Sequence, residues 1–161
     1  MESFLDNRQQ RVVLNGQCSN WAKNCSGVPQ GSILGPLFFL IYINDISIDL
    51  ESDVKLFADD TSLFSVVFDP ISSANILNRD LAKISNWAYQ WKMSFNPDLT
   101  KQAKEVIFSR KHNIANHPDL EFNNIKVERS ADQKHLGLLL DEKLTFKDHT
   151  KLVIERHTCI A

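Results

Sequence analysis

The chain has 161 residues, of which 43% are hydrophobic and 24% are charged, and its formal net charge at pH 7 is −2. This composition is typical of a globular domain with a buried core and argues against a disordered chain. A domain whose whole surface contacts phosphate groups is usually strongly basic, so any contact with a polynucleotide is expected to be local.

The cysteines and the apolar segments limit where the protein is expected to work. The three cysteines form no C-x-x-C pair, so they fit neither a disulfide framework nor a zinc cluster. We therefore expect a reducing, intracellular compartment, without a distinction between nucleus and cytoplasm. The chain begins without a signal-peptide pattern, and no segment approaches the roughly 20 apolar residues of a membrane span, so no membrane partner is expected.

The first third of the chain predicts a hairpin, a loop and a helix. Residues 11–14 are typical of a strand, and Asn15 and Gly16 form a dipeptide that favours a tight turn. A loop follows at residues 27–32, which contain two glycines and a proline. The apolar run at residues 37–43 then predicts a helix that is buried on most sides.

The middle of the chain predicts a second hairpin and a long helix. Two β-prone stretches at residues 54–57 and 63–68 flank the sequence A-D-D-T, which predicts a hairpin with two carboxylates at its tip, between Phe57 and Phe64. Asp69 and Pro70 suit the start of a helix. Apolar residues then recur at intervals of three and four, which predicts an amphipathic helix over residues 71–93.

The last third predicts short strands and a final helix. Residues 105–108 are typical of a strand, residues 120–127 of a hairpin around Asn123 and Asn124, and residues 136–140 of a further strand. A helix is expected to begin within residues 143–161. Because the chain contains no internal repeat or linker, a single domain is the simplest interpretation.

The adjacent carboxylates of Asp59 and Asp60 are the residues with the clearest chemical meaning. Two neighbouring carboxylates repel one another unless a proton or a cation lies between them, and a hard divalent ion resolves that conflict. Such ions can activate a hydroxyl nucleophile and stabilise a phosphate leaving group. Taken alone, however, two aspartates in a turn are more often explained by their hydrogen bonds to the backbone.

Two motifs in order extend this interpretation. Residues 27–37 read G-V-P-Q-G-S-I-L-G-P-L and resemble motif B of reverse transcriptases, the loop and helix that lie along the template strand. Residues 56–60 read L-F-A-D-D and resemble motif C, with phenylalanine where many relatives carry tyrosine. The resemblance implies that Asp59 and Asp60 are catalytic and bind the metal. It also implies that five residues contact nucleic acid or nucleotide: Pro29, Gln30, Gly31, Ser32 and Phe57.

Two further motifs point to one branch of this family. Residues 91–97 together with 105–109 resemble motif D of non-LTR (LINE-type) retrotransposon enzymes, and residues 135–138 resemble motif E. Motif E is the primer grip, so Leu136 and Gly137 are expected to contact the primer. The resemblance covers residues 7–149 and identifies the chain as similar to an RNA-directed DNA polymerase.

The resemblance implies an α+β palm fold, with an antiparallel sheet and helices over residues 35–46 and 71–93 packed on one face. Residues 1–142 would form a partial palm, and residues 143–161 the start of a thumb. The expected cofactor is Mg²⁺, with Mn²⁺ as an alternative ion. The expected partners are an RNA template, a DNA primer and deoxynucleoside triphosphates; no oligomeric state is indicated.

The sequence departs from the family pattern in two places. No segment of residues 1–26 resembles motif A, which carries another essential aspartate, so the palm is expected to be truncated, without fingers, motif A and most of the thumb. In motif D, Leu99 occupies the position of a family lysine, and Lys101 lies two residues further on. We therefore expect the isolated chain to have little or no polymerase activity.

Three alternatives remain open from the sequence. The first is a reverse transcriptase of the group II intron type, which shares motifs B and C. The second is a non-catalytic remnant of a retroelement that only folds, or binds nucleic acid or a protein partner. The third is an incomplete translation of a longer, active protein.

Overall fold

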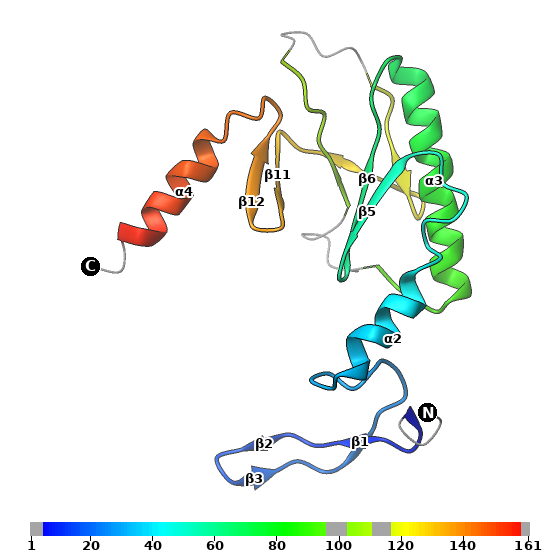
Figure 1. The fold of residues 1–161 in the computed structure, drawn as a ribbon, viewed down its shortest axis with the longest axis vertical. Coiled ribbons are helices and arrows are strands. Elements are labelled where there is room, and N and C mark those ends of the chain that lie inside the picture. The colour runs from blue at the N-terminus through cyan, green and yellow to red at the C-terminus, as the bar shows by residue number, and fades with distance from the viewer. Residues whose placement is uncertain (1–4, 96–102, 111–116, 159–161) are drawn as a thin grey trace. The chain divides into compact units, whose positions relative to one another are not determined.

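The computed structural model describes residues 5–95, 103–110 and 117–158 (Figure 1). The chain divides into two compact units, Met1–Ile46 and Ser47–Ala161, which are described in turn. Helices and two-stranded sheets alternate along the described residues, so the mixed α and β character that was expected is confirmed.

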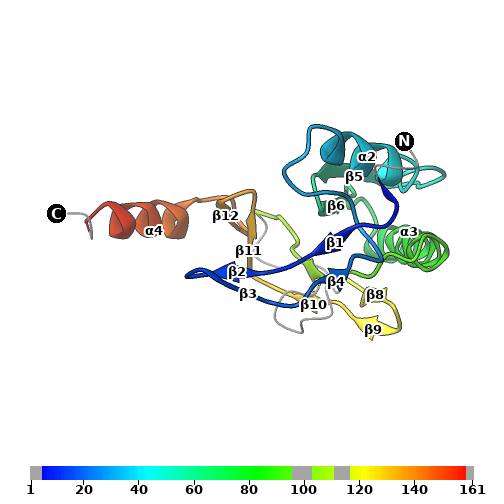
Figure 2. The same cartoon turned by 90° about the horizontal axis from the view of Figure 1, so that it is seen from below.

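The first unit begins with a two-stranded antiparallel ribbon, which Figure 2 shows as one continuous hairpin. The backbones of Asn15 and Gly16 have φ values of 48° and 78°, as a two-residue hairpin turn requires. The predicted tight turn is therefore confirmed. The strands of the ribbon are β1 (Gln9–Gln10) paired with β4 (Ala22–Lys23), and β2 (Val13–Leu14) paired with β3 (Gln17–Cys18).

Helix α2 (Leu34–Ile43) follows the glycine-containing loop of the first unit. Only Gly35 and Ile43 are buried in this helix, whereas Leu40 and Ile41 are 60% and 65% exposed. The expectation of a helix buried on most sides is therefore wrong for the described residues. An apolar sequence shows that a helix favours burial, but it does not show which surface covers it.

Helix α3 (Pro70–Gln90) is the longest element of the second unit, and local hydrogen bonds define both of its ends. The Asp69 carboxylate accepts a hydrogen bond of 2.8 Å from the Ser72 amide, which confirms the predicted start. Lys92 has a φ of 57°, and the Met93 amide donates to the Ala88 carbonyl at 2.9 Å. This C-terminal motif ends the helix at Gln90, three residues before the predicted end.

The core of the second unit lies between α3 and the hairpin of β8 (Glu121–Phe122) and β9 (Ile125–Lys126). Asn123 and Asn124 form the turn, with φ values of 52° and 61°, so this predicted hairpin is confirmed. The predicted apolar stripe of α3 supplies the helix side of this core. The residues that pack together here are Ala74, Leu77, Leu81, Leu120, Phe122 and Val127.

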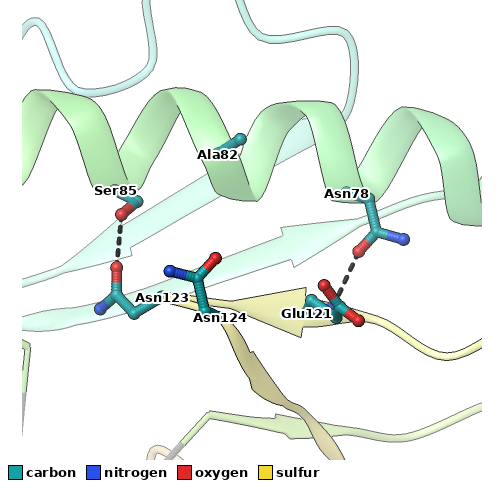
Figure 3. A pocket seen from close by; sticks show the side chains of 6 residues that line it. All are labelled: Asn78, Ala82, Ser85, Glu121, Asn123 and Asn124. Atoms are coloured by element: carbon teal, nitrogen blue, oxygen red, sulfur yellow. Dashed lines mark hydrogen bonds between the residues drawn. The ribbon is translucent and has the colours of Figure 1, made fainter.

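Polar side chains complete the contact between α3 and this hairpin (Figure 3). Asn78 accepts a hydrogen bond of 2.8 Å from the Glu121 amide and donates one of 3.2 Å to the Asp119 carbonyl. Ser85 donates to the Asn123 side chain. The shallow pocket between these residues therefore has lining groups that largely bind one another.

The strands of the described residues form six small separate sheets, each with two strands. The single antiparallel sheet with helices on one face is therefore not formed by these residues. The remaining elements are the pair β5 (Asp53–Phe57) and β6 (Asp60–Phe64), the parallel pair β7 (Lys104–Glu105) and β10 (Glu128–Arg129), the pair β11 (Asp132–His135) and β12 (Leu138–Asp141), and helix α4 (Lys147–Thr158).

Several predicted strands have different bounds in the structure, among them the strand expected at residues 11–14, which is reduced to Val13–Leu14. The strand expected at residues 63–68 begins at Asp60, and the strand expected at residues 105–108 is reduced to Lys104–Glu105. The strand expected at residues 136–140 begins with a turn instead. Strand propensity shows which residues suit an extended backbone, but the pairing partner decides where the strand begins and ends. No helix in the described part of the chain is long and apolar enough to span a membrane.

Candidate active site

The β5–β6 hairpin carries the two adjacent carboxylates. Its ladder pairs Asp53 with Phe64 at one end and Phe57 with Asp60 at the other. Ala58 and Asp59 form the two-residue turn, and the φ of Ala58 is 50°, a value that tight hairpin turns require at this position. The hairpin predicted around these carboxylates is therefore present, with Asp59 in the turn and Asp60 as the first residue of β6.

The two faces of the hairpin differ in character, because side chains alternate along a strand and directly paired residues share a face. Val54, Thr61 and Leu63 lie on one face and are partly buried. Phe57 and Asp60 lie on the other face and are exposed. Strand alternation thus directs the Asp60 carboxylate away from the side of the hairpin that packs against protein.

Phe57 and Phe64 do not both enclose the carboxylates, as the sequence suggested. Phe57 is the direct cross-strand partner of Asp60, and its side chain is 62% exposed. Phe64 pairs with Asp53 at the opposite end of the ladder. The expectation that both rings lie beside the tip is therefore wrong for Phe64, because the second strand starts three residues earlier than predicted.

The Asp59 and Asp60 carboxylates are open to a ligand. Both residues are exposed, and no side chain or amide in the described part of the chain donates a hydrogen bond to either carboxylate. Carboxylate oxygens are the donors that Mg²⁺ prefers, so the chemistry of this pair fits the ion. The described residues contain no cluster of three or more His, Cys, Asp or Glu side chains that could hold a metal, so the pair supplies part of a coordination sphere.

The loop of the first unit is shaped by its own hydrogen bonds. The Ser32 hydroxyl donates to the Pro29 carbonyl at 2.7 Å and accepts from the Gly35 amide at 3.0 Å. Gly31, at the bend of the loop, has a φ of 83°, which favours glycine. Gln30 is exposed and has no hydrogen-bond partner among the described residues, so its amide is available to a ligand. Ser32, in contrast, uses its hydroxyl to hold the loop.

The two residues expected in the primer grip form the turn between β11 and β12. Leu136 and Gly137 have φ values of 47° and 89°, and the Leu136 side chain is 48% exposed. His149 of α4 accepts a hydrogen bond of 3.3 Å from the Leu139 amide in β12. This hairpin therefore presents an apolar side chain at its tip and is connected to the helix that follows. Asn96, Leu99 and Lys101 of the expected motif D lie outside the described residues.

Comparison with known families decides how these features are classified. The family model described as reverse transcriptase (RNA-dependent DNA polymerase) matches residues 1–136. The chain belongs to the reverse transcriptase family. No solved structure is significantly similar to it.

Similar reverse transcriptases come from non-LTR retrotransposons of Drosophila melanogaster. The chain is 29% identical over 154 residues to the probable RNA-directed DNA polymerase from transposon X-element, covering 92% of this chain and 16% of that protein. It is 28% identical over 158 residues to the RNA-directed DNA polymerase from mobile element jockey, covering 92% and 17%. The corresponding values for the transposon BS protein are 26% over 164 residues, 97% and 18%.

These relatives confirm the assignment to the non-LTR type and do not favour the group II intron alternative. The chain spans about one-sixth of the length of each of the three relatives. The roles of individual residues and the boundary between palm and thumb at residue 142 stay predictions.

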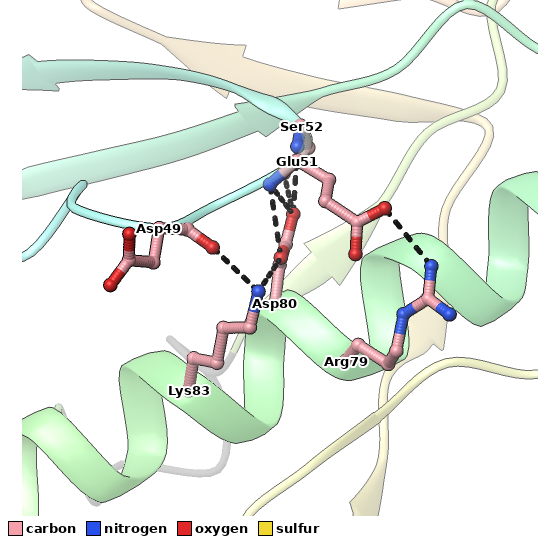
Figure 4. A network of polar contacts seen from close by, with 6 residues as sticks. All are labelled: Asp49, Glu51, Ser52, Arg79, Asp80 and Lys83. Carbon is pink, nitrogen blue, oxygen red and sulfur yellow. Dashed lines mark hydrogen bonds and ion pairs between the residues drawn. The ribbon is translucent and has the colours of Figure 1, made fainter.

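One further group in this reverse transcriptase chain, a buried carboxylate on α3, was not among the residues expected to have a function. Asp80 is 0% exposed and accepts hydrogen bonds from the Glu51 and Ser52 amides and from the Ser52 hydroxyl (Figure 4). The available signal was its position within the apolar stripe of α3, between Leu77 and Ile84. A charged residue on the buried face of a helix normally has a partner.

Proposed function

We propose that this chain contributes the catalytic hairpin of an RNA-directed DNA polymerase from a non-LTR retrotransposon, with Asp59 and Asp60 as the carboxylates that bind Mg²⁺ or Mn²⁺. The observation that carries this proposal is the pair of exposed carboxylates at the tip of the β5–β6 hairpin, which have no hydrogen-bond partner in the described part of the chain. Family membership and the polymerase names of the relatives support it.

Under this proposal, each residue at the tip of the hairpin has a defined role. Asp59 and Asp60 would hold the cation by their carboxylate oxygens. The chemistry that the ion supplies when bound is activation of a primer 3′-hydroxyl and neutralisation of charge on the leaving pyrophosphate. Phe57, on the same face as Asp60, would contact the substrate through its exposed ring.

The loop and the second hairpin would bind the nucleic acid. Gln30 offers two donors and an acceptor to the template or to the nascent base pair, and Gly31 allows the backbone to approach closely. Pro29 and Ser32 hold the loop in shape by the hydrogen bonds that they share. Leu136 and Gly137 would contact the sugars of the DNA primer. The substrates are accordingly an RNA template, a DNA primer and deoxynucleoside triphosphates.

The proposal is tested by titrating the chain with Mn²⁺ and recording the paramagnetic broadening of its amide NMR signals. We expect the amides of residues 58–61 to broaden first, and this selectivity to disappear in the Asp59→Asn/Asp60→Asn variant. Asp53→Asn is the matched control, since Asp53 is an exposed carboxylate at the other end of the same hairpin. Equal broadening around every exposed carboxylate would contradict the proposal.

A further inference from the structure

The buried carboxylate of Asp80 connects α3 to the segment that leads into the candidate catalytic hairpin. The Asp80 oxygens accept hydrogen bonds from the Glu51 amide at 3.0 and 3.2 Å, from the Ser52 amide at 2.7 Å and from the Ser52 hydroxyl at 2.7 Å. Lys83, one turn further along α3, lies 3.5 Å from the carboxylate and also donates to the Asp49 carbonyl. Figure 4 shows that all of these groups converge on residues 49–52.

The carboxylate is charged in this setting. Burial of Asp80 opposes ionisation, but the hydrogen bonds from Ser52, Glu51 and Lys83 outweigh it and lower the pKa of the carboxyl group below its ordinary value. Hydrogen bonds to an ionised acceptor are stronger than those between neutral groups. The contact is therefore a strong and specific one, and it holds two consecutive residues of the backbone.

These two residues directly precede β5, so the contact fixes the root of the hairpin. Asp59 lies seven positions after Ser52 in the sequence, so at the rise of an extended strand the tip lies about 20 Å from the root. Of the five residues in β5, only Val54 is even partly buried. The outer part of the hairpin is therefore supported mainly through β6, in which Thr61, Ser62 and Leu63 are partly buried.

A small rotation of a long hairpin at its root is amplified at its tip. A rotation of about 10° at the root displaces a tip about 20 Å away by about 3 Å, whereas catalytic groups have to be held within about 0.5 Å. The positions of the Asp59 and Asp60 carboxylates therefore depend on how the root of the hairpin is oriented. The contact of Asp80 with Glu51 and Ser52 is the buried one between this root and α3, and the more exposed contacts of Arg79 with Glu51 and of Lys83 with Asp49 accompany it.

We propose that Asp80 is a positioning residue for the Asp59 and Asp60 carboxylates: by holding the amides of Glu51 and Ser52 on α3, it fixes the direction of the β5–β6 hairpin. The part of this inference that concerns metal binding rests on the proposed function. The part that concerns the hairpin does not, and the two are measured separately.

The test compares variants of the whole chain by amide hydrogen exchange and by Mn²⁺ affinity. Asp80→Asn keeps the size of the side chain but replaces one accepting oxygen by an NH2 group, which then faces the N–H and O–H donors of Glu51 and Ser52. Ser52→Ala is a milder second variant, because it removes the hydroxyl donor alone. Arg79→Ala is the matched control: Arg79 precedes Asp80 and contacts Glu51 at 3.1 Å, but through side chains that are 58% and 48% exposed.

In Asp80→Asn we expect the amides of β5 and β6 to exchange about 10-fold faster or more, while those of the α3 core keep their protection. We expect the affinity for Mn²⁺ at Asp59 and Asp60 to fall about 5-fold in the same variant, with smaller changes in Ser52→Ala and none in Arg79→Ala. If Asp80→Asn does not fold, the same comparison is made with Ser52→Ala.

Two results would overturn the inference. One is an unchanged exchange rate in β5 and β6, and the other is an acceleration that is equal in the hairpin and in α3, which indicates a general loss of stability. If the unsubstituted chain binds no Mn²⁺ at the hairpin, the proposed function fails. The ratio of exchange rates still decides whether Asp80 orients the hairpin.

Discussion

The carbonyl oxygen of Pro29 lies 2.8 Å from the point at which a side chain would begin at Gly35. Heavy atoms at this separation are closer than carbon and oxygen atoms in contact normally are. The Pro29 carbonyl cannot move away freely, since the Ser32 hydroxyl and amide both donate to it, at 2.7 and 3.3 Å. Gly35 is thus required by the close approach of the loop to the first turn of α2.

We expect Gly35→Ala to destabilise the loop and α2 by about 1–3 kcal/mol, because the added carbon forces the backbone of Pro29 to shift. Urea unfolding followed by the NMR signals of α2 measures this effect. Ile33→Ala is the control, since that side chain is 95% exposed and lies two residues away. Equal stability of the two variants would show that the loop relaxes without strain.

The hydroxyl oxygen of Thr61, directly after the two carboxylates, is buried and has no hydrogen-bond partner among the residues that the structure describes. Thr61→Val replaces this group by a methyl group of similar shape, so we expect an increase of about 1 kcal/mol in the free energy of unfolding. The control is Thr145→Val, which removes a hydroxyl that donates to Asp141 at 3.1 Å and is expected to destabilise. A loss of stability in Thr61→Val would show that this hydroxyl has a partner in solution.

The parts of the fold that were correctly predicted are those that a few neighbouring residues determine. The turns at Asn15 and Asn123 follow from backbones that tolerate positive φ, and the start of α3 follows from one carboxylate and an amide three residues away. The apolar stripe of α3 was readable for the same reason, because its spacing reflects the geometry of a single helix.

The features that depend on distant partners could not be predicted. Asp80 stands out as a carboxylate on an apolar stripe, yet its donors at Glu51 and Ser52 lie 29 and 28 residues away in the sequence. The exposure of α2 and the shortness of the strands were missed for the same reason, because burial and strand length both depend on partners that are distant in the sequence. In the candidate site, the sequence motifs were enough to place Asp59 in a hairpin turn and Gln30 in a loop. The distance of Phe64 from the tip could not be predicted, because it depends on the register of pairing between β5 and β6.

The start of α4 is expected to depend on pH through Asp141. Hydrogen bonds from the Thr145 amide, and then from the Phe146 amide and the Thr145 hydroxyl, outweigh desolvation and lower the pKa of the Asp141 carboxyl below its ordinary value of 3.8. Since the pKa is lower in the folded state, the contribution of Asp141 to stability is complete above about pH 4. It is lost as the pH falls through the folded-state pKa.

A carboxyl ¹³C NMR titration of Asp141 measures this pKa directly, and Asp141→Asn assigns the signal. We also expect the stability difference between the unsubstituted chain and Asp141→Asn to be constant at neutral pH and to shrink below about pH 4, because both then carry an uncharged group. A folded-state pKa at or above 3.8 would contradict the hydrogen-bonding pattern at this turn.

The last prediction concerns catalysis by the chain itself. Two-metal nucleotidyl transfer requires carboxylates that fix both coordination spheres, and the described residues bring only Asp59 and Asp60 together, without a third ligand in reach. We therefore expect no primer extension by the isolated chain on an RNA template with Mg²⁺, under conditions in which an active reverse transcriptase extends the same primer. Template-dependent synthesis that disappears in Asp59→Ala/Asp60→Ala would refute this expectation, because the pair would then suffice for both metal positions. Synthesis that persists in the double variant would come from a contaminating polymerase. The Mn²⁺ titration would then be the measurement that decides whether these carboxylates bind a metal.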